Sequence, residues 1–200
     1  MLKAAIDAVP LANRPIGTAF RSAWDSVSMS MAYTPWVLFQ NGIAADADCP
    51  HWNPRGARPG TGCETTSWRR VGPDKIQFGG DDDPISAGGF YGFTPGQRMT
   101  ANMSRTGGGG VSGANTVNGG TLRLTASGTI AVGLWNGVAL SGSNYSGYSG
   151  NGGTIRGRYF LSGFLIAIQD EGGRTSLGFI AGKRETGGNY LFLNGKQYWD

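Results

Sequence analysis

Apolar and polar residues alternate along much of the C-terminal half of the chain, which is the period of a half-buried β-strand. In residues 120–133, Leu122 and Leu124 alternate with Arg123 and Thr125, so one face is apolar and the other is polar. These positions predict a succession of antiparallel strands. The other runs rich in apolar residues cover 75–78, 89–93, 154–168, 176–181, 190–193 and 196–199.

Turn signals separate these runs at the spacing expected for antiparallel hairpins. Asn194-Gly195 lies between two short apolar runs, and Asn-Gly is a strong hairpin signal because both residues tolerate a positive φ. Asn136-Gly137 offers the same two-residue turn, and Asp170 to Gly173 predicts a third turn. The fold class that we expect is mainly β, an antiparallel Gly-rich β-sandwich or barrel.

The first 45 residues differ from the rest because glycine is scarce and the apolar pattern changes. Starting from Phe20, the segment 19–27 places apolar residues at i, i+3, i+4 and i+7, which predicts a short helix or arm. A strand is expected near residues 36–39, with Asn41-Gly42 as its turn. We therefore expect an extended or short-helical N-terminal segment that anchors the protein.

Composition divides the chain into three segments. Residues 1–45 form the predicted arm, and residues 46–75, with four prolines and four glycines, form a loop-rich connector. Residues 76–200 form a Gly-rich antiparallel β domain. Within it, the four glycines 107–110 predict either a mobile tip or a place where two backbones meet closely.

The global composition excludes several classes of protein. Glycine accounts for 36 of 200 residues and charged residues for 15%, which is unlike a mainly helical protein. A hydrophobic content of 39% with 11% aromatic residues is too high for a disordered chain. The net charge of +4 is too small to indicate a nucleic-acid partner. We expect no signal peptide, since the first residues lack an apolar core, and no membrane span.

Residues able to carry chemistry are few and poorly spaced. Cys49, His51 and Cys63 do not have the paired spacing of a zinc site, although the two cysteines could close a disulfide. His51 is the only histidine, and no nucleophile motif accompanies it. The acidic runs, 81–83 and 170–171, are more typical of solvated turns than of an acid–base pair or a calcium site. We therefore expect no catalytic residue, no metal and no cofactor.

Aromatic and arginine residues gather in and near the connector. Tryptophan and arginine carry much of the binding energy in protein interfaces. We therefore predict a subunit interface formed by Trp36, Trp52, Arg55, Arg58, Trp68, Arg69 and Arg70. The run 141–151 has the Ser, Gly, Asn and Tyr composition of adaptable recognition loops, and we predict Tyr145 and Tyr148 as residues of a surface binding loop.

In composition the chain resembles the small virion proteins of tailed bacteriophages, meaning tail-fibre, tail-tip or head-decoration subunits. The resemblance rests on the arm, the loop-rich middle and the Gly-rich β domain, and no family motif carries a functional residue over. It implies a non-enzymatic structural subunit located in the virion. Such a subunit assembles with itself, often as a trimer, and with other virion proteins. It would attach to a host surface, where a glycan could be the receptor, or stabilise the particle.

Two alternatives belong to other functional classes. The first is an independent carbohydrate-binding β-sandwich, which would be a monomer stabilised by a glycan. The second is a small glycoside hydrolase that uses Asp170 or Glu171, and replacing one carboxylate would then abolish activity while leaving the fold intact. An assembly subunit should instead form oligomers.

Overall fold

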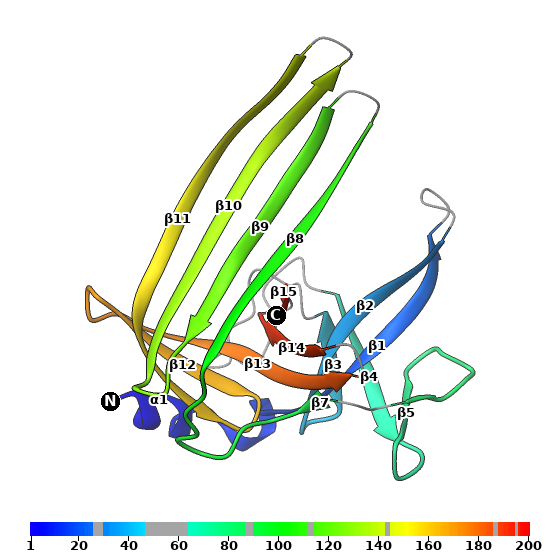
Figure 1. Ribbon diagram of the computed structural model, residues 1–200. Helices are drawn as coiled ribbons and strands as arrows, with labels where there is room; N and C mark the ends of the chain where they lie inside the picture. Colours follow the sequence, from blue (N-terminus) through cyan, green and yellow to red (C-terminus); the bar gives the residue numbers. More distant parts are fainter. Residues whose placement is uncertain are drawn as a thin grey trace.

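A computed structural model describes residues 1–25, 30–46, 64–86, 90–111, 114–142, 145–185, 188–194 and 196–200. It shows a mainly β, antiparallel protein with a closed eight-stranded barrel, a nearly closed six-stranded barrel and a short N-terminal helix (Figure 1). The predicted fold class is confirmed, and barrels rather than a sandwich are the architecture.

The large barrel closes because each strand pairs with its chain neighbour and the last strand returns to the first. The ladder of β12 with β13 continues the sheet, and Trp199 of β15 pairs with Ser104 of β8 to complete it. A short strand, β7 (Phe90–Tyr91), pairs with β13 outside this circle. The barrel strands are β8 (Ala101–Val111), β9 (Ala114–Leu124), β10 (Thr129–Gly142), β11 (Tyr145–Ser162), β12 (Leu165–Asp170), β13 (Thr175–Glu185), β14 (Gly188–Leu193) and β15 (Lys196–Trp199).

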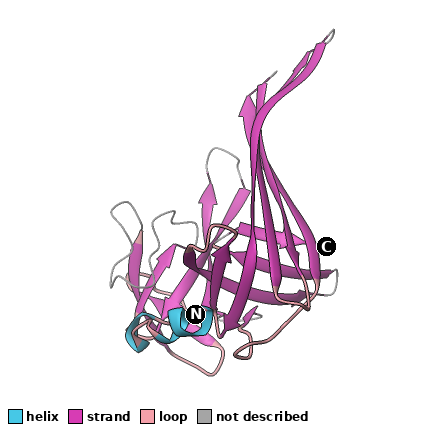
Figure 2. Ribbon diagram, turned by 90° about the vertical axis from the view of Figure 1, so that its left-hand side faces the viewer, coloured by secondary structure: helices cyan, strands magenta, loops and turns pink. Residues whose placement is uncertain are grey.

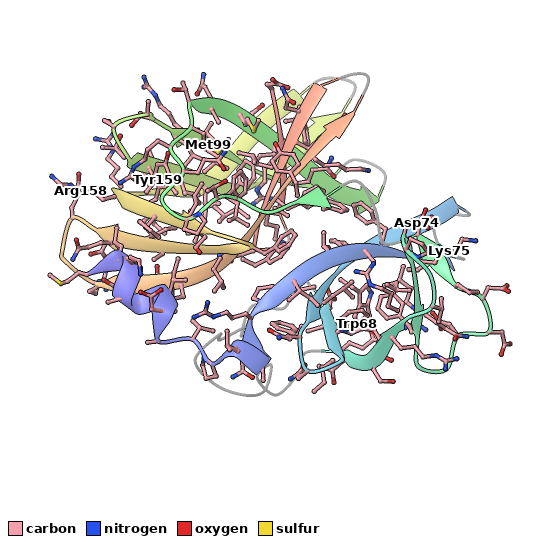
Figure 3. The ribbon with its side chains drawn as sticks, turned by 90° about the horizontal axis from the view of Figure 1, so that it is seen from below. Trp68, Asp74, Lys75, Met99, Arg158 and Tyr159 are labelled. Atoms are coloured by element: carbon pink, nitrogen blue, oxygen red, sulfur yellow. The ribbon has the colours of Figure 1, made fainter. Side chains whose placement is uncertain are left out.

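Apolar side chains from alternate positions fill the large barrel. Leu122 and Leu124 are fully buried there, which is the interior face that the alternation in the sequence predicts. Tyr159 is also fully buried, and its hydroxyl accepts a hydrogen bond from the Met99 N–H at 3.1 Å and donates to the Thr125 carbonyl at 3.0 Å. Figure 3 shows Tyr159 beside Met99. The interior is therefore a packed core.

The smaller barrel is built from the N-terminal part of the chain. Its strands run from Pro15 to Ser86, across both composition boundaries at residues 45 and 75. Its interior holds Trp36, Leu38 and Phe78 among its buried residues. The strands, in the order in which they pair, are β1 (Pro15–Asp25), β2 (Ser30–Phe39), β3 (Ile43–Asp46), β4 (Thr65–Arg70), β5 (Lys75–Phe78) and β6 (Ile85–Ser86).

A layer of aromatic residues joins the two barrels. Phe192 of β14 lies 5.0 Å from Phe90 and 5.8 Å from Phe20 between ring centroids, in edge-on geometries. Val37 and Phe39 of β2 are buried in the same cluster, on the face opposite to Trp36 and Leu38. Both faces of β2 are thus apolar, because one faces the small-barrel core and the other faces the large barrel.

The helix lies elsewhere than the sequence predicts. The only α-helix among the described residues is α1 (Leu2–Asp7), whose Ile6 packs with Leu165 and Ala167 on the outside of β12. The helix expected over 19–27 is wrong, since this segment contributes to β1 through Asp25. Ala19 faces the small-barrel core while Phe20 faces the interbarrel layer, so both faces of the strand are apolar and the spacing imitates a helix.

Several predicted turns are confirmed and others are wrong. Gly42 turns with a positive φ of 79°, and Asn194, at φ 49°, turns β14 into β15. The Asp170 to Gly173 turn links β12 to β13. Asn136-Gly137 is instead the middle of β10, with partners in both β9 and β11. The long strand predicted over 154–168 is interrupted at Gly163, where β11 ends and β12 follows.

Candidate functional site

Strands β8 to β11 continue far beyond the closed part of the large barrel. Ser104 of β8 is the residue that pairs with β15. The cross-strand row that contains Ser104 continues through Thr121 of β9, Gly133 of β10 and Thr154 of β11. Past that row the four strands form one antiparallel layer, which Figures 1 and 2 show standing away from both barrels. Its two longer segments, in β10 and β11, have nine residues each, which at about 3.3 Å per residue gives a length of roughly 30 Å. We call it the projecting sheet, residues 105–111, 114–120, 134–142 and 145–153.

Both outer strands of the projecting sheet are edges. In the part of the chain that the structure describes, β15 pairs with β8 at Ser104 alone, and β12 pairs with β11 only over Gly157–Ser162. Along β8 from residue 105 and along β11 up to residue 156, no described strand therefore pairs with the outer side of the sheet. Unpaired strand edges are templates for pairing with another chain.

These edges have none of the usual protection. Arg105 is the one charged residue in the sequence of the projecting sheet, which also contains no proline. Its guanidinium carbon lies 5.8 Å from the ring centre of Tyr198, and its Nε is buried at the barrel mouth. Burial raises the pKa of the Tyr198 hydroxyl, and the Arg105 charge opposes that rise. Soluble proteins normally place lysines or prolines on a free edge, so a long edge without them fits one that a neighbour covers.

Glycine allows close backbone approach where the projecting sheet leaves the barrel. A Cβ on Gly120 would lie 2.6 Å from the Gly133 carbonyl oxygen of the next strand. A Cβ on Gly157 would overlap the Gln169 carbonyl of β12, at the point where β12 stops following β11. A glycine inside a strand often marks a close approach of two backbones, and the structure confirms that interpretation of the sequence for Gly120 and Gly157.

The predicted binding loop is largely strand. Tyr145 pairs with Gly142 and Tyr148 with Ala139, so both tyrosines belong to the hairpin that β10 and β11 form at the far end of the projecting sheet. The loop expected over 141–151 is wrong for these residues, because a ladder with β10 orders their backbone. Glycines 107–110 are likewise paired, with residues 115–118 of β9. Surface binding by the two tyrosines stays a prediction.

The predicted interface residues with described side chains belong to the small barrel. Trp36 packs in its core with 2% of its surface exposed, which leaves the indole no surface for a partner. The Trp68 indole N–H donates to the Phe39 carbonyl at 3.0 Å. Arg69 donates twice to the Gln77 side-chain oxygen, at 2.7 and 3.2 Å.

Arg70, next along β4, donates to the Pro73 carbonyl at 2.5 Å. Both arginines are exposed, and together with Trp68 they line one hairpin, β4–β5. For these three residues a subunit contact stays a prediction. Trp52, Arg55, Arg58, Cys49 and Cys63 lie outside the described residues.

A groove on the outside of the large barrel escapes prediction from the sequence. It has a volume of about 760 Å³ and is lined by strands β9 to β12. Three exposed arginines, Arg123, Arg156 and Arg158, line it, with Asp170 and Glu171 also in the lining. Arg123 lies more than thirty residues before Arg156 and Arg158, so only the cross-strand register brings it beside them.

Arg174 holds Asp170, one of the two acidic residues of this groove, in its charged form. The Arg174 backbone N–H donates to the Asp170 carboxylate at 2.9 Å, and the Arg174 guanidinium donates to its second oxygen at 2.8 Å. These contacts, the backbone hydrogen bond above all, lower the pKa of Asp170 although partial desolvation opposes them. A general acid needs the opposite shift, so Asp170 is poorly suited to the general-acid role in glycoside hydrolysis.

Comparisons with protein-family models, curated proteins and solved structures find no match to this chain. Among the described residues, no group of three or more His, Cys, Asp or Glu side chains is placed to hold a metal ion. Within the same residues, no helix has the length and apolar character needed to cross a membrane.

Proposed function

We propose that this protein is a non-enzymatic structural subunit of a large assembly, of the kind that forms the virion of a tailed bacteriophage. The observation that carries the proposal is the projecting sheet, whose two edges are unpaired among the described residues and unprotected by charge. An edge of this kind adds a strand from a neighbour through main-chain hydrogen bonds. The projecting sheet would therefore join copies of the chain side by side.

The composition of the projecting sheet supports this assignment. Figure 2 shows it as a single layer rising above the barrels, with no second described layer against it. A few strands are stable in water when an apolar face packs on something else, and glycine weakens strands further. A Gly-rich single layer of roughly 30 Å gains most when neighbours cover it.

The barrels would supply the body of the subunit and the projecting sheet its reach. Strands β10 and β11 extend far from the barrels (Figure 1), and β11 carries Tyr145 and Tyr148 at that far end. Tyrosine provides contact area at low entropic cost, which suits attachment to a host surface such as a glycan. We expect the assembly to be a homo-oligomer, with other virion proteins as further partners.

Light scattering on the full chain tests the proposal. We expect the mass of the protein to rise above the 21.0 kDa of one chain as concentration increases. Gly108→Lys with Ser149→Lys places a positive charge on each edge strand, and this variant should remain at the mass of one chain. Gln40→Lys with Thr100→Lys adds the same charge at exposed barrel positions and should assemble normally.

A melting curve shows whether each variant is folded before its mass is compared. An original chain that stays at 21.0 kDa at every concentration would overturn the proposal. Equal dissociation of the edge variant and the barrel variant would also contradict it, because added charge anywhere would then explain the effect.

A further inference from the structure

The arginines of the outer groove form a compact array on one face of the sheet. Arg123 and Arg156 both pair with Ala131, so they lie on one row two strands apart, at about 10 Å. Arg158 follows Arg156 by two residues on the same face, about 7 Å along the strand. Gln169 pairs with Arg158 and completes the neighbouring row.

The arginines of this array have no ion-pair partner within the described chain. All three are exposed. Asp170 faces the groove, but Arg174 occupies both of its oxygens. Glu171 is the remaining acidic residue of the lining, so the groove is positive. Arginine forms bidentate hydrogen bonds with carboxylates, which makes the array suited to an acidic segment.

The chain carries such a segment on its other barrel. The turn between β5 and β6 contains Asp81, Asp82 and Asp83. Asp81 is bound within its own barrel by Arg21, at 2.5 Å. Asp82 and Asp83 are exposed and form no ion pair with a described residue, so their carboxylates face solvent as an adjacent pair.

The groove and the acidic turn cannot meet within one molecule. Figure 3 places Arg158 at one end of the molecule and Lys75, the first residue of β5, at the other. An acidic turn at one end and a positive groove at the other end are complementary between molecules. Contacts between two different patches repeat head to tail and form rings or filaments.

We infer that the groove of Arg123, Arg156 and Arg158 binds the Asp82–Asp83 turn of a second copy of this chain. The inference rests on the proposed function and adds a second kind of contact to it. The projecting sheets join copies through strand edges, whereas the groove joins the large barrel of one copy to the small barrel of the next. The groove contact depends on charge, so salt should weaken it.

Charge reversal on each side tests the contact. At low salt, Arg156→Glu and Asp82→Arg should each raise the protein concentration needed for the increase in mass by at least about tenfold. An equal mixture of the two variants should recover the mass, because each groove then meets a turn of opposite charge. Lys75→Glu and Asp74→Arg change the net charge equally at exposed positions of the β4–β5 turn and should assemble as the original chain does.

The outcomes separate this contact from the edge contact. If the edge lysines of Gly108→Lys with Ser149→Lys dissociate the assembly while neither charge reversal does, the groove inference is wrong and the proposed function stands. A full chain that never assembles overturns both. Binding of heparin that Arg156→Glu abolishes, with self-association unchanged, would assign the groove to an anionic polymer and overturn the inference.

Discussion

The same four strands, β8 to β11, form two regions with opposite properties. Inside the barrel they carry alternating apolar residues such as Leu122, Leu124 and Val132, and they enclose a core with the strands on either side. Past the row of Ser104 they become rich in glycine and asparagine and lose their lateral partners among the described residues. The barrel half explains why the chain folds, and the projecting half explains why it would assemble.

The contrast shows that strand pairing and core formation are separate requirements. A ladder forms in both halves, since residues 114–120 pair on both sides just as residues 121–124 do. The barrel half gains most of its stability from buried apolar surface, about 25 cal/mol per Å². Among the described residues, the projecting half has only pairing within one layer, so its stability should depend on neighbours. Variants that affect one half and spare the other test this division.

The largest effect is expected from a cavity in the barrel half. Leu122 is fully buried, and Leu122→Ala should lower the free energy of unfolding by about 2–5 kcal/mol. Leu134, in the first row of the projecting sheet, is 40% exposed, so Leu134→Ala should lower it by less than about 1 kcal/mol. Urea unfolding of the two variants at a concentration where the chain is monomeric measures both values. Similar losses would show that the projecting sheet shares the core.

A smaller effect is expected from a methyl group added to β11 on either side of the boundary. Gly157→Ala would place its Cβ against the Gln169 carbonyl of β12, and a backbone atom cannot move aside cheaply. We expect a loss of about 1–3 kcal/mol in the free energy of unfolding. Gly153 has no atom within 4 Å of an added Cβ, so Gly153→Ala should change it by less than about 0.5 kcal/mol.

Thermal melting of these two variants against the original chain provides the measurement. The comparison is sharp because the two glycines lie in one strand, four residues apart. Equal melting temperatures for the two variants would mean that the backbones of β11 and β12 move apart easily at Gly157. The boundary between the two halves would then be flexible.

The sequence predicts the barrel half well because its signals are local. Alternation around Leu122 and Leu124 reports a strand with one buried face, and the turn residues Asn194 and Gly173 report backbones with positive φ. The prediction fails at β1, because Ala19 is buried on one face while Phe20 packs, partly buried, on the other, and consecutive apolar residues blur the period of two. A strand between two cores cannot be told from a helix by spacing alone.

The candidate sites were harder to predict for a different physical reason. Asn136-Gly137 is a local turn signal, but ladders with Asn118 and Asn151 hold both sides of β10 extended. The outer groove depends on register between strands that lie more than thirty residues apart, and no local motif marks Arg123 or Arg156. Pairing between distant strands decides both the extended backbone at Asn136-Gly137 and the arginine groove, and the sequence of a single segment does not show which strands will pair.

The smallest effect is expected from a substitution at Arg174, whose side chain binds Asp170 in the lining of the outer groove. The Arg174 backbone N–H is the main cause of the lowered Asp170 pKa and stays in Arg174→Gln, whereas the guanidinium, which also favours the charged form, is removed; the pKa of the Asp170 carboxyl should therefore rise only part of the way toward its ordinary value. A folded-state pKa below the unfolded one stabilises the protein at pH values above the unfolded pKa, about 3.9. That contribution disappears as pH falls through the folded pKa, and it is small because this ion pair is exposed.

An NMR titration of the Asp170 carboxyl in the original chain and in Arg174→Gln measures the shift directly. Titration at the same pH in both proteins would show that the Arg174 guanidinium adds nothing to what the backbone N–H of residue 174 already does for this carboxylate. The variant also sharpens the comparison between the two halves. A released Asp170 would be free to pair with Arg156 or Arg158, so the groove contact should weaken while the edges of the projecting sheet still pair. A loss of both contacts together would mean that assembly through the two regions is one cooperative event rather than two independent ones.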